Sequence, residues 1–201
     1  MKIVKILGGL GNQMFQYALF LSLKERFPHE QVMIDTSCFR NYPLHNGFEV
    51  DRIFTQKAPV ASWRDILKVA YPYPNYRFWQ IGKYILPKRK TMCVEQKDFS
   101  FDAAALTRKG DCYYDGYWQH EEYFCDIKET IWEAFSFPEP GDGQNKEIGS
   151  LLRASDSVSL HVRRGDYVNH PLFRGTCDLD YYKRAIHYME ERVNAKVCRF
   201  F

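Results

Sequence analysis

The pattern of apolar and polar positions near the start of the chain predicts a strand, a helix and a second strand. Residues Lys2 to Leu7 form an apolar-rich stretch with the length of a strand, and Val32 to Ile34 form another. Between them, from Met14 to Phe27, apolar side chains recur at helical spacing, at Phe15, Ala18, Leu19 and Leu23. A strand, a glycine-rich turn and a helix in succession are typical of an α/β fold with parallel strands.

The rest of the chain continues this alternation after an irregular stretch. One strand is expected from Cys112, ending in a polar loop that reaches Gln119, and another over Ser157 to Arg163, where apolar and polar residues alternate. Helices are expected at Ser62 to Val69, at His120 to Phe135, in a short segment that ends at Arg153, and at Leu179 to Val193.

A stretch rich in proline and glycine divides the chain into unequal parts. Pro138-Glu139-Pro140-Gly141-Asp142-Gly143 has the composition of a linker. With 201 residues, of which 45% are hydrophobic, the chain can bury one full core and part of a second. We therefore expect a Rossmann-like domain over residues 1–137, a linker over 138–143, and the incomplete beginning of a second Rossmann-type half over 144–201.

Charge adds one local feature to this picture. The net charge of +3 and the pI of about 8.4 do not indicate a nucleic-acid binder. Between Lys68 and Lys90, however, there are six basic residues and no acidic one, interleaved with tyrosines, Phe78 and Trp79. This segment has two interpretations: a wall that stacks on sugar rings or touches an anionic membrane surface, or an aromatic insertion into the core with a solvated basic face.

Metal ligands and targeting signals are not indicated. The six cysteines form no C-x-x-C pair and no Cys/His cluster, which argues against a structural zinc site and favours a reducing compartment. Asp178-Leu179-Asp180 could bind a metal as a pair of carboxylates, but Asp178 is better explained as the cap of the following helix. The first apolar run is too short for a signal peptide or a membrane anchor, so we expect a cytoplasmic protein.

The glycine-rich turn, Gly8 to Gln13, allows a close backbone approach to a ligand at the start of a helix. Gly9 and Gly11 match the first two positions of the dinucleotide fingerprint, and Asp35 lies about where a ribose-binding carboxylate would be. The third glycine position of the fingerprint is Met14, so the match is incomplete. It leaves an NAD-dependent oxidoreductase as one alternative function.

Ser157 to Tyr167 is the stretch that most strongly suggests a reactive or ligand-binding site. It is a predicted strand followed by two arginines, a glycine and an aspartate. Arg163 and Arg164 can present forked donors to a diphosphate, and Asp166 can orient one of them or accept a proton. The same residues could also form a surface turn with a solvated ion pair. Open α/β sheets bind ligands at the carboxyl ends of their strands, which is where the two arginines are expected. This position favours the first interpretation, an anionic substrate.

Three stretches together resemble the α-1,2-fucosyltransferases of glycosyltransferase family 11. They are Gly8 to Ala18, the segment Gly116-Tyr117-Trp118-Gln119 with Tyr123-Phe124, and His161 to Tyr167. The resemblance implies a GT-B-like fold, with an acceptor-side domain first and a donor-binding domain second. It also implies a GDP-fucose donor, a galactose-containing or lipid-linked glycan acceptor, inversion at the anomeric carbon and no required metal or cofactor.

The resemblance also implies roles for individual residues. Arg163, Arg164 and Asp166 correspond to the catalytic arginine motif, with Arg163 as the main diphosphate contact and Asp166 or Asp115 as candidate bases. The expected donor-binding residues are His161, Arg163, Gly9, Gly11, Asn12 and Gln13, with the last two reaching into the donor cleft from the first half. The expected acceptor-side residues are Asp115, Tyr117, Trp118 and Gln119.

Family members continue beyond the position equivalent to Phe201, so the resemblance implies a chain that lacks much of the donor-binding half. We therefore expect an impaired fucosyltransferase, with a non-catalytic glycan-binding remnant as a further alternative. The acceptor chemistry and the basic segment together suggest a cytoplasmic protein that touches the inner membrane face peripherally.

Overall fold

The computed structural model describes residues 1–43, 45–162, 171, 175 and 177–192. The chain divides into two compact units, Met1–Pro138 and Glu139–Phe201. We describe each unit by itself.

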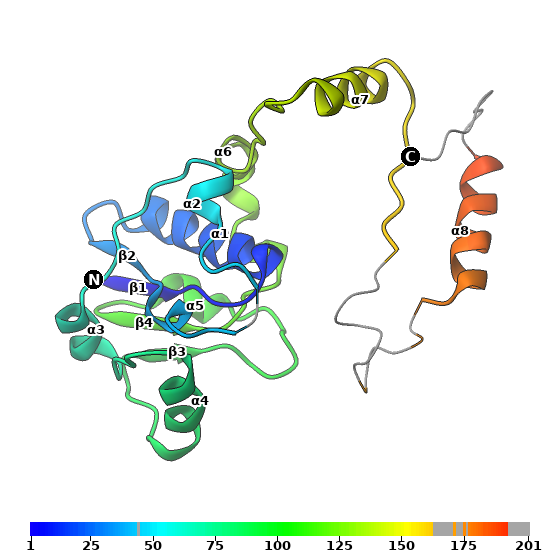
Figure 1. Cartoon of the computed structure of the whole chain (residues 1–201). Helices are drawn as coiled ribbons and strands as arrows, with labels where there is room; N and C mark the ends of the chain where they lie inside the picture. Colours follow the sequence, from blue (N-terminus) through cyan, green and yellow to red (C-terminus); the bar gives the residue numbers. More distant parts are fainter. Residues whose placement is uncertain (44, 163–170, 172–174, 176, 193–201) are drawn as a thin grey trace. The chain divides into compact units, whose positions relative to one another are not determined.

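The first unit is built on a parallel sheet of four strands. These are β1 (Lys2–Lys5), β2 (Val32–Asp35), β3 (Met92–Val94) and β4 (Cys112–Asp115), in the order β2-β1-β4-β3 (Figure 1). The register pairs Lys5 with Asp35 and Val94 with Asp115. The strands expected at both ends of the first helix and at Cys112 are confirmed, and the mixed α/β architecture with parallel strands is compatible with a Rossmann-like fold.

Helices cover both faces of this sheet. Val4, Ile34 and Tyr114 face a large core shared with α1 (Leu10–Arg26), α2 (Val50–Ile53) and α5 (Ala103–Thr107). The alternate positions Ile3, Met33 and Tyr113 face a smaller core closed by α3 (Trp63–Val69). Successive strand residues point to opposite faces, so each strand contributes to both cores. Two more helices complete the unit: α4 (Tyr76–Ile85) and α6 (Lys128–Ala134).

Two helices of the first unit differ from the prediction. Helix α1 begins at Leu10, so Gly11, Asn12 and Gln13 lie in its first turn rather than in a loop. The helix expected over His120 to Phe135 is split into η2 (Glu121–Tyr123), η3 (Cys125–Ile127) and α6. The split occurs because Phe124 has non-helical backbone angles, φ −148° and ψ 16°.

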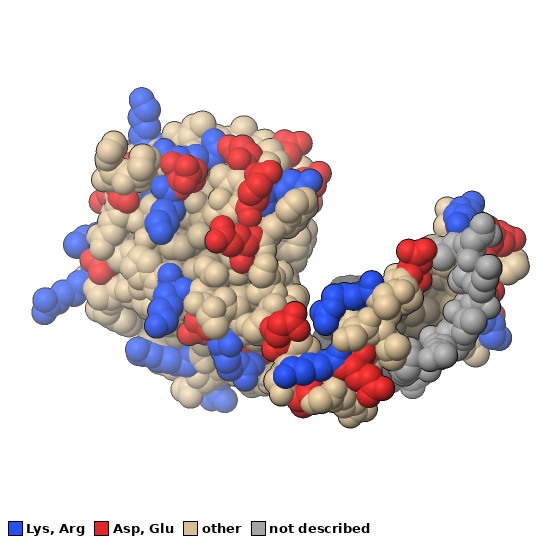
Figure 2. Space-filling model, turned by 90° about the horizontal axis from the view of Figure 1, so that it is seen from above, with Lys and Arg blue, Asp and Glu red and all other residues tan. Residues whose placement is uncertain are grey.

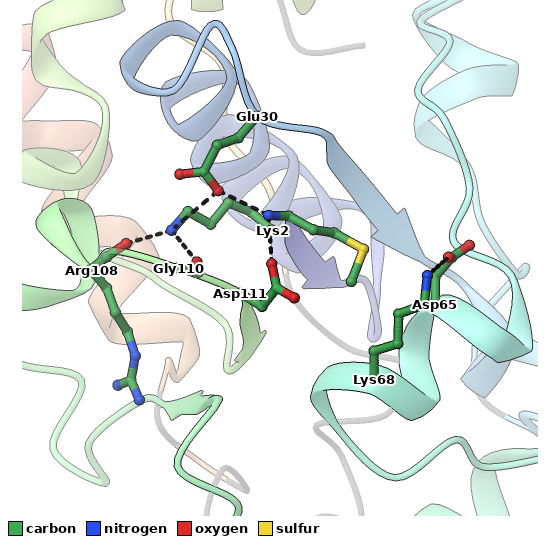
Figure 3. Close-up of polar contacts among 8 residues, drawn as sticks. Lys2, Glu30, Asp65, Lys68, Arg108, Gly110 and Asp111 are labelled. Atoms are coloured by element: carbon green, nitrogen blue, oxygen red, sulfur yellow. Dashed lines mark hydrogen bonds and ion pairs between the residues drawn. The ribbon is translucent and has the colours of Figure 1, made fainter.

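Polar contacts close the amino end of the sheet (Figure 3). The side chain of Lys2 is fully buried. Its Nζ donates to the carbonyl oxygen of Arg108 and, at 2.7 Å, to that of Gly110. The same nitrogen lies 3.7 Å from a carboxylate oxygen of Glu30. The amino group of Met1 lies 2.9 Å from carboxylate oxygens of both Glu30 and Asp111. Open α/β sheets bind their ligands at the opposite end, outside the carboxyl ends of the strands.

In the second unit, the structure describes helices α7 (Gly143–Arg153) and α8 (Leu179–Glu190). Asp178 accepts a hydrogen bond from the backbone N–H of Tyr181 at 2.7 Å, so its predicted role as a helix cap is confirmed. The strand predicted from Ser157 is not formed over residues 157–162, where Val158, Leu160 and Val162 are about half exposed. A strand needs a hydrogen-bonding neighbour, and the described residues of this unit form none.

Charges of both signs are interspersed over the face of the molecule that Figure 2 shows. Among the described residues, no helix combines the length and the apolar character needed to cross a bilayer.

Candidate functional site

The candidate site lies at the carboxyl ends of the two central strands. β1 and β4 are neighbours in the sheet, and the loops that leave them carry Gly8-Gly9 and Gly116-Tyr117-Trp118-Gln119. Ligands of open α/β sheets bind just outside the carboxyl ends of the strands. The fold therefore brings two of the three sequence motifs to one place.

The turn between β1 and α1 depends on its glycines. Gly8 has a φ of +99°, and a Cβ atom there would lie 2.7 Å from the side-chain nitrogen of Asn12. Gly9 is the N-cap of α1, and no side chain caps this helix end or places a carboxylate in its first turn. The imidazole of His45 lies over Gly9, 3.2 Å from where a Cβ would be. The backbone N–H groups in the first turn of α1 therefore have no side-chain acceptor. Such a helix N-terminus suits a phosphate or carboxylate ligand.

Gln13 stabilises this turn from inside the protein. Its side chain is fully buried, and its amide nitrogen donates to the carbonyl oxygens of Gly8 at 2.9 Å and Gly47 at 2.8 Å. Its amide oxygen accepts from the backbone N–H of Glu49 at 2.8 Å. Because its amide already joins two loops, Gln13 has a positioning role in this structure.

Two hydrogen bonds join the glycine-rich motif to the segment after β4. The Gln119 amide donates to Asn12 Oδ1 at 2.6 Å, and the Gln16 amide donates to the carbonyl of Gly116 at 3.0 Å. Gln16 also accepts from the backbone N–H of Leu7 at 2.8 Å, so it holds both loops at once. Gln119 is exposed and Asn12 is partly exposed, so this pair is the part of the junction that a ligand can reach.

Glu95 fixes the backbone of the Gly116-Tyr117-Trp118-Gln119 segment from the loop after β3. Its two carboxylate oxygens accept from the backbone N–H groups of Tyr117 and Trp118, each at 2.6 Å. Gly116 packs directly on it, since a Cβ at that position would lie 2.3 Å from the Cβ of Glu95. Paired backbone donors on one carboxylate make a rigid turn.

Within that segment, Trp118 and Tyr117 differ in accessibility. Trp118 has a φ of +58° and is buried against Tyr114 and Tyr123, with ring centroids at 5.8 and 5.3 Å. It supports the loop from the core rather than offering a surface for sugar stacking. Tyr117 is only partly buried. Burial is the main cause of its raised pKa, with smaller contributions from Tyr76 and Asp115, so its hydroxyl stays protonated at neutral pH.

On the other face of the sheet, the strand ends carry a buried charged cluster. Asp115 forms an ion pair with Lys5, whose Nζ also lies 4.0 Å from the ring centroid of Trp79. Asp35 accepts from the hydroxyl of Tyr113 at 2.6 Å and from the backbone N–H of Ser37 at 2.8 Å. Asp35 is buried and both of its oxygens have internal donors, which argues against a ribose-binding role in a dinucleotide site.

The third motif is described only in part. His161 is exposed, and its carbonyl oxygen accepts from the hydroxyl of Tyr182 at 3.4 Å. Arg163, Arg164 and Asp166 lie outside the described residues. Among the residues that are described, no three His, Cys, Asp or Glu side chains are grouped as metal ligands.

Sequence reasoning missed two residues of this site, Glu95 and His45. Glu95 follows a strand of only three residues, and its partners are 22 and 23 positions away. His45 belongs to the irregular stretch after β2, where no periodicity indicates which residue folds back over Gly9. Neither residue has a local sequence signal.

Comparison with known proteins agrees with the motifs. The family model "Glycosyl transferase family 11" matches residues 1–200. The chain is 33% identical to an alpha-1,2-colitosyltransferase from Escherichia coli, over 96% of this chain and 65% of the relative. It is 27% identical to the O-antigen biosynthesis glycosyltransferase WbnK from Escherichia coli, over 92% of this chain and 66% of the relative.

The chain thus spans slightly less than two thirds of the length of these two relatives. No solved structure matches it. The match of the family model along almost the whole chain, together with the junction of two motifs at the carboxyl end of the sheet, establishes that the chain belongs to glycosyltransferase family 11.

Proposed function

We propose that this protein transfers a fucosyl or closely related sugar from a GDP-sugar to a galactose-containing glycan, in α-1,2 linkage and with inversion. Family membership supports transfer from a nucleotide sugar to a glycan acceptor. The names of the two relatives describe α-1,2 colitosyl transfer and O-antigen biosynthesis. The observation that carries the proposal is the family match over residues 1–200. The Asn12–Gln119 hydrogen bond, which joins two family motifs beside the N-terminus of α1, indicates where in the first unit a ligand would bind.

In this proposal the donor diphosphate is the group that the protein recognises most strongly. The departing GDP gains negative charge as the glycosidic bond breaks, and the forked guanidinium of Arg163 stabilises that charge with help from Arg164 and His161. The amides at the start of α1, around Gly9, Gly11 and Asn12, carry a positive partial charge that also suits a phosphate. This chemistry uses no metal ion.

Deprotonation of the acceptor hydroxyl needs a base. Asp115 already forms an ion pair with Lys5 and is largely buried, so only part of its carboxylate is available. We therefore assign the base first to Asp166 and keep Asp115 as the second candidate. Tyr117 and Gln119, the accessible residues of their segment, would contact the acceptor.

Donor binding to the 201-residue chain tests the proposal directly. Isothermal titration with GDP, GDP-fucose, GDP-colitose and NAD should detect the GDP compounds and not NAD. Asn12→Ala and Gln119→Ala should each weaken GDP-sugar binding about tenfold, because each leaves the other partner of the exposed pair unsupported. Gln31→Ala, which changes an exposed glutamine before β2 at the amino end of the sheet, is the matched control.

Turnover tests the chemistry separately. Release of GDP in the presence of a galactoside, and the anomeric configuration of the product, report transfer and inversion. Arg163→Lys should lower kcat by about 10²–10³, because lysine keeps the charge but loses the planar fork. Binding of NAD without GDP would refute the proposal, and glycan binding without any GDP release would indicate a non-catalytic glycan-binding protein.

A further inference from the structure

Helix α4 is attached to the rest of the first unit by one side only. Asn75 caps it by accepting from the backbone N–H groups of Arg77 at 3.0 Å and Phe78 at 3.3 Å. The ring of Tyr73 packs so closely on Gly82 that a Cβ there would lie 2.3 Å from a ring carbon. On its inner side, Trp79 lies over the buried Lys5. These contacts fix the orientation of the helix.

The opposite side of α4 is apolar and exposed. Phe78, Ile81 and Ile85 recur at helical spacing and are 58, 59 and 72% exposed. The exposed side chain of Leu86 and the segment Tyr71-Pro72-Tyr73-Pro74 continue this surface as the walls of a shallow groove. An exposed apolar surface of this kind on a soluble unit marks an interaction site.

Basic residues flank this surface. Arg77 lies on α4, and Lys88 and Lys90 follow within five residues of its end. Lys83 also lies on α4, but its Nζ is 4.5 Å from the ring centroid of Trp79, on the inner side of the helix. All four are exposed, and no described carboxylate is within ion-pair distance of them. Arg89 differs from these residues, because its guanidinium donates to the carbonyl oxygens of Leu67 and Ala70 at 2.7 and 2.8 Å and so caps the end of α3. Arg89 is a structural residue.

We propose that α4 and the adjoining residues 71–74 and 86–90 form a docking surface for an anionic lipid bilayer. A helix that carries aromatic and branched apolar side chains on one side and flanking Lys and Arg matches the chemistry of the lipid interface. Apolar side chains enter the acyl boundary while the cations meet the headgroup phosphates. The lack of acidic residues from Lys68 to Lys90 makes this surface complementary in charge to an anionic membrane.

If the proposed function holds, this surface also places the enzyme near lipid-linked acceptors. Trp79 touches Lys5, Lys5 pairs with Asp115, and Asp115 directly precedes the Gly116-Tyr117-Trp118-Gln119 segment. These contacts connect the inner side of α4 to the strand end that carries the candidate site. Membrane binding itself does not depend on the proposed activity.

The test is vesicle binding by the whole chain. The protein is mixed with vesicles of phosphatidylcholine alone, or of phosphatidylcholine with phosphatidylglycerol, and the bound fraction is measured by flotation at increasing salt. We expect binding to the anionic vesicles that weakens with salt. Lys88→Gln and Lys90→Gln should each lower the partition coefficient about fivefold. Ile81→Ser/Ile85→Ser should lower it about tenfold or more, with little change in the salt dependence.

Matched controls lie on the other side of the sheet. Lys24→Gln/Lys128→Gln removes two exposed lysines from α1 and α6, and Trp132→Ser removes an exposed aromatic residue from α6. These variants should bind vesicles like the unchanged chain. A thermal melt of each variant separates loss of binding from loss of folding.

Three results would overturn the proposal. The first is equal binding to neutral and anionic vesicles, or none to either. The second is unchanged binding by the Ile81→Ser/Ile85→Ser variant. The third is a chain that is dimeric by light scattering and becomes monomeric in that variant, which would make the surface an interface between copies of this protein. Loss of GDP-sugar binding with intact vesicle binding would instead count against the proposed function alone.

Discussion

At the scale of residues, three glycines near the candidate site differ in whether the fold requires them. Gly8 adopts a backbone conformation that other residues disfavour. Gly116 lies against Glu95, where a side chain has no room. A Cβ on Gly11, in contrast, would meet nothing within 4 Å. Folding therefore explains Gly8 and Gly116, whereas neither the backbone conformation nor the packing requires a glycine at position 11.

This difference yields a paired prediction. Gly116→Ala should lower the free energy of unfolding by about 1–3 kcal/mol, because the new methyl group displaces Glu95 from the N–H groups of Tyr117 and Trp118. Gly11→Ala should raise it by up to about 1 kcal/mol, since alanine is the better helix former, yet weaken GDP-sugar binding. Urea unfolding and donor titration of both variants provide the comparison. If Gly11→Ala binds donor normally, its backbone does not approach the ligand.

The candidate site also shows which residue roles and contacts can be predicted from the sequence. Gly9, Gly11, Asn12 and Gln119 were identified as candidate site residues from motifs, but nothing in the sequence indicates that Asn12 and Gln119 meet across 107 positions. The sequence also does not indicate that the side chains of Gln13 and Trp118 point into the core. A polar or aromatic side chain in a motif either contacts a ligand or supports the loop that binds it. The packing around the side chain shows which of the two roles it has.

At the scale of elements, local signals were the most predictable. Helix α3 was expected correctly from the pattern of its residues, and the cap of α8 was expected correctly because Asp178 directly precedes that helix. Strand β3 was missed because its three residues are ordered mainly by pairing with β4, a distant segment. The Ser157 strand was expected from alternation alone, which cannot supply the neighbour that a strand needs.

The cap of α3 gives a prediction with a pH dependence. Ser62 and Asp65 form a capping box, and hydrogen bonds from the Ser62 side chain and backbone hold the pKa of Asp65 below its ordinary value of 3.8. A lowered folded-state pKa contributes stability above pH 3.8 that is lost as the pH falls through the folded value. Ser62→Ala should thus lower Tm by about 2–4 °C at pH 7. The difference from the unchanged chain should shrink at pH 3.

Ser136→Ala is the control for this measurement. The Ser136 hydroxyl donates to the carbonyl of Trp132 at 3.0 Å and contacts no carboxylate, so any loss of stability should be independent of pH in this range. Melts of both variants at pH 7, 5 and 3 separate the two cases. A Ser62→Ala difference that stays constant from pH 7 to pH 3 would mean that Asp65 does not contribute through its charge.

At the scale of the whole molecule, the described hydrophobic cores and the arginine motif belong to different parts of the chain. Among the residues that the structure describes, all those that form the two hydrophobic cores or pack at their edges belong to the first 135 positions. The described helices of the second unit, α7 and α8, have no buried residue. The arginine motif is in the second unit, while the glycine-rich turn and the Gly116-Tyr117-Trp118-Gln119 segment are in the first.

This separation predicts how a fragment of residues 1–138 behaves. The fragment contains both cores and the whole parallel sheet, so it should unfold cooperatively with a Tm within a few degrees of the full chain. It should bind GDP-sugar far more weakly, since it keeps the α1 amides but lacks Arg163 and Arg164. Limited proteolysis provides the fragment if cleavage falls, as we expect, between Pro138 and Gly143, where nearly every residue is exposed.

The measurements are differential scanning calorimetry and donor titration on the purified fragment and on the full chain. A fragment with a broad or absent transition would show that residues after Pro138 complete the core of the first unit. A fragment that binds GDP as tightly as the full chain would show that the diphosphate is held by the first unit alone. In that case Arg163→Lys in the full chain should leave GDP affinity unchanged, and the helix N-terminus beside Asn12 and Gln119 would become the main phosphate contact.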